Sequence, residues 1–252
     1  MSTYKNANYA INRIGGEGVG SKAGQGIYEE SSTPKYDLGE KLELKDGRVF
    51  RDASVAATTA AGDIVSQVVS ATGLVEVENG MTAAAVGATD VIITSSELSS
   101  ATANQFAGGY LHTVDDAGEG FTYRIKSNTA ASSNAVTFTL YDAIVVAITT
   151  ATDAAITGNL YGSVRPALGS ADYIAAGVAP RAFTANYYGW VQTRGIATVQ
   201  VDAAVTIGLP LMLSDEHAGQ AEAADNTHPL IGFATFAQDT TDGFTGVALQ
   251  LP

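Results

Sequence analysis

The sequence predicts an all-β fold with only minor helix, built as a β-sandwich or as small β-barrel units, with an extended glycine-rich arm at the N-terminus. Only 15% of the 252 residues are charged, and Ala, Thr, Ser and 27 glycines take their place. This composition suits strands joined by tight turns and is too poor in Glu, Lys and Arg for an all-α protein. Period-two alternation of apolar and polar residues, interrupted by glycines at short intervals, supports the same conclusion.

Residues 1–35 form the predicted arm. They hold six glycines between positions 15 and 26 and few large apolar side chains. A segment without a core of its own is either flexible or ordered by a partner. The pattern changes at Tyr36, where Leu42 and Leu44 alternate with charged residues before an Asp46-Gly47 pair. That pair predicts a hairpin with a type I′ turn, because Asp and Gly tolerate positive φ angles.

The next stretch, residues 53–107, is compatible with strands or with helix. Residues 53–77 are rich in Ala, Val and Thr around Gly62 and Gly73, which favours short strands. Residues 94–97 (Thr-Ser-Ser-Glu) have the spacing of a helix-capping box. The residues that follow lack helical periodicity, so we predict a turn or a single helical turn there.

The clearest strand signal lies in residues 110–140. Residues 110–114 and 121–126 flank an acidic, glycine-containing turn, and Phe121, Tyr123 and Ile125 share one face by alternation. The positions that repeat this pattern in the next strand are Val136, Phe138 and Leu140. We therefore predict three consecutive strands.

Beyond a continuous apolar run at 143–148, residues 165–180 show no obvious strand. Strands resume in the C-terminal third at 187–193, 196–201, 209–213, 230–236 and 244–251. Their predicted turns lie at Gly195, Gly208, Gly219 and Gly243. We accordingly expect a β-rich domain over 36–180 and a small barrel-like unit over 181–252, which is either separate from the preceding domain or continuous with it.

Charge is distributed unevenly along the chain. The formal net charge is −13, yet residues 1–52 hold eight basic and eight acidic residues, so residues 53–252 carry the whole excess. A chain this acidic is repelled by nucleic-acid phosphates, so we expect no direct nucleic-acid partner. The asymmetry suggests that the neutral first segment docks while the acidic remainder faces water.

Cysteine is absent, which excludes disulfides and thiolate chemistry. The N-terminus lacks the pattern of a signal peptide, and no apolar run approaches a membrane span. We therefore expect synthesis in a cytoplasm and no membrane partner.

No motif predicts a catalytic, cofactor or metal residue. His112, His217 and His228 lack the local spacing of a metal site. The glycine-rich run at 15–22 departs from a phosphate-binding loop, because Ser21 intervenes before Lys22.

The acidic turn holding Asp115, Asp116 and Glu119 lacks the twelve-residue calcium-loop pattern, so a solvated turn is favoured. Trp190 is expected in a core, with an interface as the alternative. Dispersed carboxylates leave glycosidase chemistry open, but we predict a protein that is not an enzyme and binds no cofactor.

Several short strings resemble virion structural proteins of tailed phages over residues 40–252. They are Lys-Asp-Gly-Arg-Val-Phe at 45–50, Asn-Gln-Phe-Ala-Gly-Gly-Tyr-Leu at 104–111, Tyr-Gly-Trp-Val-Gln-Thr-Arg-Gly at 188–195, Leu-Ile-Gly-Phe-Ala-Thr-Phe at 230–236 and Val-Ala-Leu-Gln-Leu at 247–251. Residues 208–211 (Gly-Leu-Pro-Leu) and 231–234 (Ile-Gly-Phe-Ala) also look like the barrel elements of small capsid decoration, or cement, proteins.

The resemblance implies a bacteriophage protein made in the bacterial host cytoplasm and located on the capsid exterior. Its implied partner is the major capsid protein, which it binds and stabilises, and its implied state is a homo-oligomer, with a trimer favoured. A tail, fibre or receptor-binding component is the alternative, and a glycan-degrading virion enzyme is the third reading.

Overall fold

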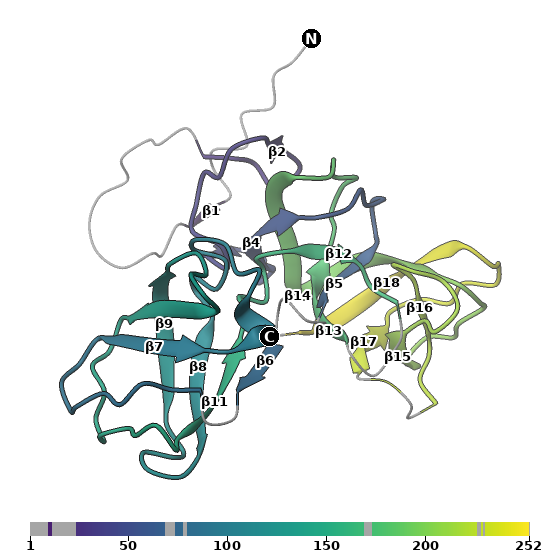
Figure 1. The fold of residues 1–252 in the computed structure, drawn as a ribbon. Coiled ribbons are helices and arrows are strands. Elements are labelled where there is room, and N and C mark those ends of the chain that lie inside the picture. Colours follow the sequence, from purple (N-terminus) through teal and green to yellow (C-terminus); the bar gives the residue numbers. More distant parts are fainter. Residues whose placement is uncertain are drawn as a thin grey trace. The chain divides into compact units, whose positions relative to one another are not determined.

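The computed structural model describes residues 10–11, 24–68, 74–77, 80–168, 173–225, 228 and 230–251. The chain forms two compact units, unit 1 (Met1–Val68 with Leu160–Pro252) and unit 2 (Val69–Asn159) (Figure 1). This differs from the division expected at residue 180, because strands on both sides of that position pair within unit 1. The prediction of an all-β fold is confirmed: the described elements are strands and one short 3-10 helix.

Unit 1 consists of two closed rings of strands that share one long strand, β14. The first ring runs β4–β12–β5–β13–β14 and closes by pairing of β14 with β4; the second runs β14–β16–β15–β17–β18 and closes by pairing of β18 with β14. The strands of unit 1 are β1 (Ala10–Ile11), β2 (Glu30–Ser31), β3 (Lys41–Leu44), β4 (Val49–Val55), β5 (Ile64–Val68), β12 (Val164–Pro166), β13 (Tyr173–Val178), β14 (Tyr187–Val201), β15 (Pro210–Leu213), β16 (Ala221–Ala223), β17 (Leu230–Ala234) and β18 (Gly243–Gln250).

Strand β14 joins the two rings because it does not stop at Gly195. Its pairing with β4 ends at Arg194↔Val49, and its pairing with β18 begins at Arg194↔Gln250. The predicted turn at Gly195 is wrong: the register shifts between Gln192 and Arg194, and Gly195 has a φ of 83° within the strand. A glycine tolerates this conformation without the steric penalty of a Cβ, so the strand bends and continues.

Each ring encloses its own core. The core of the first ring includes Val55, Val164, Phe183 and Val191. The core of the second includes Val199, Leu211, Ile231 and Val247. Because these residues alternate with outward-facing ones along the strands, each ring buries its inner face.

Residues 165–180 contain two strands, β12 and β13, that the sequence reading missed. The β13 segment is rich in Ala and Gly, and such residues have low strand propensity. Its small residues follow from close packing: a Cβ on Gly177 would lie 2.9 Å from the Val191 side chain. Packing within the ring, and not the β propensity of its residues, therefore explains why this segment forms a strand.

The predicted hairpin at Asp46-Gly47 is present between β3 and β4, but its turn is not type I′. Only Gly47 has a positive φ, of 85°. The Gly47 N–H donates to the Leu44 carbonyl at 3.0 Å, and the Leu44 N–H donates to the Arg48 carbonyl at 2.9 Å. This is a three-residue loop with one left-handed glycine.

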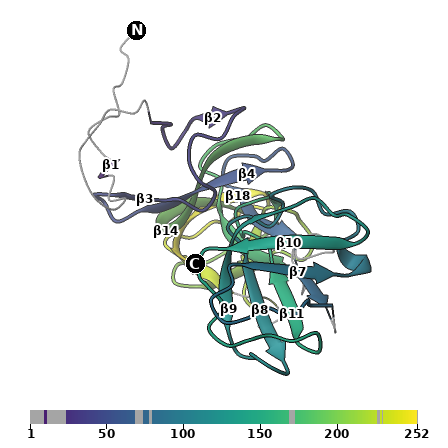
Figure 2. The same ribbon diagram turned by 60° about the vertical axis from the view of Figure 1, so that its left-hand side comes forward.

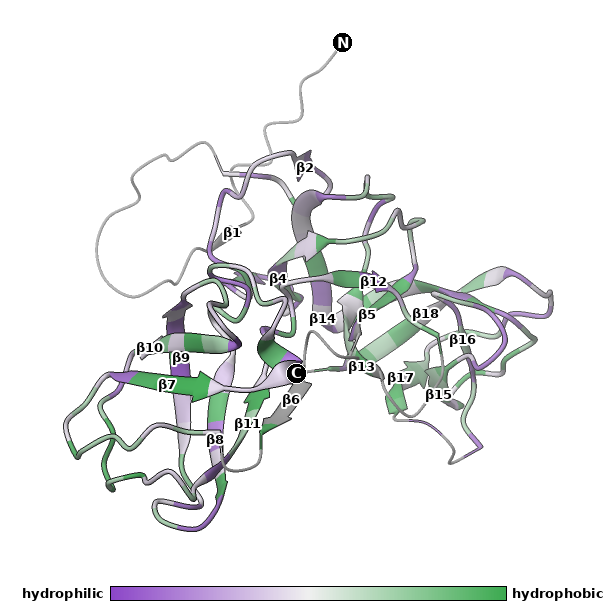
Figure 3. Ribbon diagram, in the orientation of Figure 1, coloured by the Kyte–Doolittle hydropathy of each residue, from purple (hydrophilic) through white to green (hydrophobic). Residues whose placement is uncertain are grey.

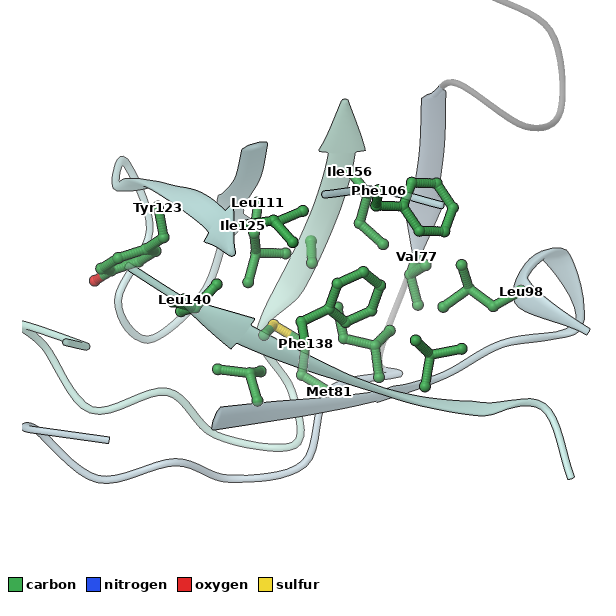
Figure 4. Packing of buried hydrophobic residues seen from close by; sticks show 14 of the residues in the cluster. Val77, Met81, Leu98, Phe106, Leu111, Tyr123, Ile125, Phe138, Leu140 and Ile156 are labelled. Carbon is green, nitrogen blue, oxygen red and sulfur yellow. The ribbon is translucent and has the colours of Figure 1, made fainter. Parts of the chain in front are cut away.

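Unit 2 is a six-stranded sheet curled around one core. Its order is β6–β11–β8–β9–β10–β7. The strands are β6 (Leu74–Val77), β7 (Asp90–Thr94), β8 (Tyr110–Asp115), β9 (Thr122–Asn128), β10 (Ala135–Leu140) and β11 (Asp153–Thr157). The chain just after β6 returns to β7, where the Thr94 N–H donates to the Gly80 carbonyl at 2.8 Å. Figure 4 shows the apolar side chains that fill the enclosed space.

The strand alternation predicted for unit 2 is confirmed except at Phe121, which precedes β9 and is 36% exposed. Tyr123, Ile125, Val136, Phe138 and Leu140 are all buried. The residues 94–97 lead into one 3-10 turn, η2 (Ser96–Leu98), whose cap is Ser95. The apolar run at 143–148 forms no strand: Ile144 and Ile148 are buried, whereas Val145 and Val146 are exposed.

The predicted arm, residues 1–35, lies largely outside the described residues. Its described residues, 10–11 and 24–35, contradict a segment that is flexible or awaits a partner, because β1 pairs with β3 and residues 24–35 pack within unit 1. Strand β2 pairs with β14, and the Gln25 side chain donates to the Tyr188 carbonyl at 2.8 Å. The arm therefore cannot extend to residue 35.

Candidate functional site

The most prominent surface feature is an apolar face on the outside of the second ring. One residue from each of four neighbouring strands lies in register across it: Ile196↔Ala248, Ala248↔Phe233 and Phe233↔Pro210. Ile196 is 56% exposed and Phe233 is 38% exposed. Because adjacent strands are about 4.8 Å apart, this row is about 14 Å long. Figure 3 shows hydrophobic colouring on β17 and much of β18.

Two further aromatic rings extend this face along β18. Phe236 is 50% exposed and Phe244 is 42% exposed. A Cβ on Gly246 would lie 3.0 Å from the Phe236 ring, so the glycine leaves room for that ring over the strand. Gly62 does the same for Phe244, whose ring would lie 2.8 Å from a Cβ there. We call Ile196, Pro210, Phe233, Phe236, Phe244 and Ala248 the outer face.

A shallow hollow of about 370 Å³ adjoins the outer face and shares Ile196 and Phe244 with it. Tyr28 and Arg48 line its other side. Arg48 pairs with Asp46 at 2.8 Å. Burial lowers the pKa of this guanidinium, but its hydrogen bonds and charge interactions with Asp46 and Tyr28 raise it by more, so the pKa is raised overall. None of the residues that line the hollow is acidic.

Two arginines lie beside this face. Arg48 lines the hollow, and Arg194, which is exposed, precedes Ile196 by two positions on β14. The whole chain carries −13. Because Arg48 is paired with Asp46 at 2.8 Å, Arg194 is the arginine here that can attract an acidic protein surface, which would repel the rest of the chain.

The three histidines lie in different elements, His112 in unit 2 and His217 and His228 in unit 1. His112 on β8 bridges neighbouring strands, with Nδ1 3.0 Å from the Thr122 hydroxyl and Nε2 3.1 Å from the Thr157 hydroxyl. The His217 N–H donates to the Ser214 hydroxyl at 2.9 Å in a turn of unit 1. His228 is half-buried just before β17.

The acidic turn after β8 is held by its own backbone. The Asp116 N–H donates to Asp115 Oδ1 at 2.8 Å, and the Glu119 N–H donates to the Asp116 carbonyl at 3.1 Å. Across the described part of the chain, no three His, Asp or Glu side chains converge as metal ligands would. The glycine-rich run at 15–22 lies outside the described residues.

Trp190 lies in a small core, as the sequence predicted, and is 2% exposed. It packs with Leu44 and Phe50. Two carboxyl groups have raised pKa values. Burial and the neighbouring Asp215, Asp202 and Asp225 raise the pKa of Glu222 to about 7, and burial with Glu40 and Asp37 raises the pKa of Asp52 to about 7.

Comparisons with known proteins leave the chain without a match: no family model, no curated protein and no solved structure resembles it. The resemblance to tailed-phage proteins therefore stays a prediction. Among the described residues, no helix has the length and apolarity needed to cross a lipid bilayer.

Sequence reasoning missed the outer face, although part of its signal was present. Phe244 alternates with Gly246 and Ala248 on one side of β18, opposite the buried Val247 and Leu249. Apolar residues on both faces of a strand indicate either a strand that is buried on both sides or a strand with an exposed apolar outer face. Only the closed ring shows which side is outside.

Proposed function

We propose that this chain is a non-enzymatic structural subunit of a tailed-phage virion, which binds the outer surface of the capsid and stabilises it. One observation supports docking above the others, namely the outer face of the second ring, whose exposed apolar residues carry no acidic neighbour within the face. The capsid as the partner, and trimeric association, come from the sequence resemblance.

The proposed docking surface differs from the one expected from charge alone. Residues 24–52 contain β3 and the start of β4, so they form part of the sheet of unit 1 and are not only a docking segment. Of the neutral first segment, Tyr28 and Arg48 reach the hollow beside the outer face. The neutral segment therefore contributes the polar rim of the docking surface, and β14, β15, β17 and β18 contribute its apolar centre, which is the usual anatomy of a protein interface.

The row of four apolar residues is too small to hold a partner tightly by itself. Stable pairs bury roughly 800 Å² on each side, far more than a row about 14 Å long provides. A repeating shell offers many equivalent sites, so a modest face suits a subunit whose neighbours also contact the shell. The occupant that we assign to the outer face is therefore the shell surface.

A binding assay with expanded capsids tests the proposal. Purified chain is mixed with expanded capsids of the encoding virus, and bound copies are counted after sedimentation. We expect saturable, symmetric binding that Phe233→Glu weakens more than tenfold, because a carboxylate would enter an apolar contact. The matched control is Val145→Glu in unit 2, at a side chain that is 54% exposed, and it should bind like the wild type.

Four results would overturn parts of the proposal. Absence of saturable binding removes the capsid as partner, and equal binding of Phe233→Glu and wild type removes the outer face as the docking surface. Immunogold labelling of virions over the tail would move the chain to the tail or fibre alternative. Release of sugars from host-surface glycans would establish the enzyme reading instead.

A further inference from the structure

Residues 25–40 form a strap over the outside of the first ring. Trp190 Nε1 donates to the Gln25 carbonyl at 3.0 Å, and β2 pairs with β14 through Tyr188↔Ser31 and Gly189↔Glu30. The Tyr36 ring packs on Trp190 with centroids 4.9 Å apart. Figure 2 shows β2 and β3 in purple beside β4 and β14.

A carboxyl group is buried beneath this strap. Asp52 on β4 pairs in register with Trp190, so its side chain shares a face with Trp190 and Phe50. It is fully buried, and neither carboxyl oxygen has a hydrogen-bond partner among the described residues. Its backbone holds the end of the strap: the Gly39 N–H donates to the Asp52 carbonyl at 2.8 Å, and the Asp52 N–H donates to the Glu40 carbonyl at 3.1 Å.

The charges that face Asp52 are negative. Asp37 and Glu40, at the end of the strap, both act on it, and the phenol of Tyr36 lies close enough for Asp52 to influence it. On β14, the facing side chains are Trp190 and Gln192, which carry no charge.

The three nearby cations are engaged by other groups. Arg48 lies over the Phe50 ring, with 5.7 Å to its centroid, and pairs with Asp46 at 2.8 Å. Arg51 and its partner in register, Lys41, alternate to the other face of the β3–β4 hairpin. The Arg51 guanidinium donates to the Gly39 carbonyl at 3.0 Å and lies over the Tyr161 ring. An ionised Asp52 would therefore be buried beside two carboxylates without a counter-ion, which is strongly unfavourable.

We propose that the strap is a proton-controlled clasp, closed over Trp190 and Phe50 while Asp52 is neutral and released when Asp52 ionises. Release exposes the apolar cluster of Leu44, Phe50 and Trp190 and frees the β2 edge of β14. The strand pairing of the strap with β14 covers only two residue pairs. Glu30 adds an ion pair with Arg181 at 3.5 Å and accepts from the Thr184 N–H at 2.8 Å, so release must open these contacts too. The clasp does not rest on the apolar residues of the outer face, but Tyr28 belongs to both the strap and the rim of the hollow, so release would also change that rim.

The direction of the pH dependence follows from burial. Desolvation first, then Glu40 and Asp37, raises the pKa of Asp52 from 3.8 to about 7 in the closed form. A raised pKa means that the closed form binds the proton more tightly, so closure is fully favoured below the ordinary pKa and weakens as pH rises through about 7. A shift from 3.8 to about 7 changes the opening equilibrium by up to about a thousandfold.

Fluorescence of Trp190 measures the clasp directly, because Trp190 is the single tryptophan of the chain. We expect wild-type emission to move to longer wavelength as pH rises through about 7, while far-UV circular dichroism stays constant. Asp52→Asn, which cannot ionise, should keep the short-wavelength emission throughout. Glu40→Gln removes one repelling charge and should open less at high pH than the wild type.

Glu43→Gln is the matched control, because Glu43 is an exposed acid on β3 whose carboxylate pairs with Lys41 at 2.8 Å. It should follow the wild-type profile. The proposal is overturned by wild-type emission that does not change with pH, by a transition that persists in Asp52→Asn, or by a circular dichroism change with the same midpoint, which would indicate global unfolding. Glu40→Gln keeps Asp52 in place, so the test stands even where Asn at position 52 prevents folding.

Discussion

Phe138→Ala should destabilise unit 2 and leave unit 1 intact. Phe138 is fully buried in the core of unit 2, and its ring lies 5.7 Å from that of Phe106 (Figure 4). Replacing a buried Phe by Ala removes transfer free energy and leaves a cavity, which together cost about 3–5 kcal/mol. Every element of this core belongs to residues 69–159, so the cost falls on unit 2.

Hydrogen exchange followed by mass spectrometry separates the two units. Where exchange from unit 2 occurs through its unfolding, a loss of about 4 kcal/mol speeds exchange in peptides from β9 and β10 by about 10³. Peptides from β14 should exchange at the wild-type rate. Val145→Ala, at an exposed position of the same unit, serves as the control and should change neither. Equal acceleration in β10 and β14 would refute the reasoning, because it would mean that the two units unfold as one.

Three further substitutions are measured by urea denaturation, two in unit 1 and one in unit 2. Gly189→Ala places a Cβ 2.2 Å from the buried Phe183 ring and should cost about 2 kcal/mol of stability by overpacking. Gly208→Ala has nothing within 4 Å of its Cβ and should cost about 1 kcal/mol because of its positive φ. Equal costs for the two variants would contradict the clash with Phe183. Asn128→Ala removes bonds of 2.8 Å from the Phe106 N–H and 2.9 Å to the Thr102 and Thr129 carbonyls, and should cost about 2–3 kcal/mol in unit 2. A decrease of no more than about 0.5 kcal/mol in the free energy of unfolding, as for a typical surface substitution, would show that water replaces these hydrogen bonds.

Local patterns predicted local structure well in this chain. The alternation of Tyr123 and Ile125, and of Val136, Phe138 and Leu140, was enough to place β9 and β10 and their buried faces. The burial of Trp190 was also predicted, since a large aromatic residue within a strand packs into a core more often than it is exposed. These features depend on period-two geometry, which any strand imposes on its own residues.

Other features depend on which segments meet. Gly195 reads as a turn in sequence, yet it bends one continuous strand, because β4 and β18 hold β14 on either side of it. Strand β13 is too rich in Ala and Gly to be recognised, and its small residues are explained by the Val191 side chain against Gly177. Residues 24–35 resemble a free arm until their contacts with Tyr188 and Trp190 are seen.

The sequence by itself determined the all-β class, the absence of cysteine chemistry and the excess of negative charge, because composition and short-range periodicity carry them. The tertiary structure alone decided the two rings that share β14, the apolar outer face and the burial of Asp52 beneath the strap. Ring closure and burial are set by contacts between residues far apart in the chain, and neither leaves a pattern that neighbouring residues share.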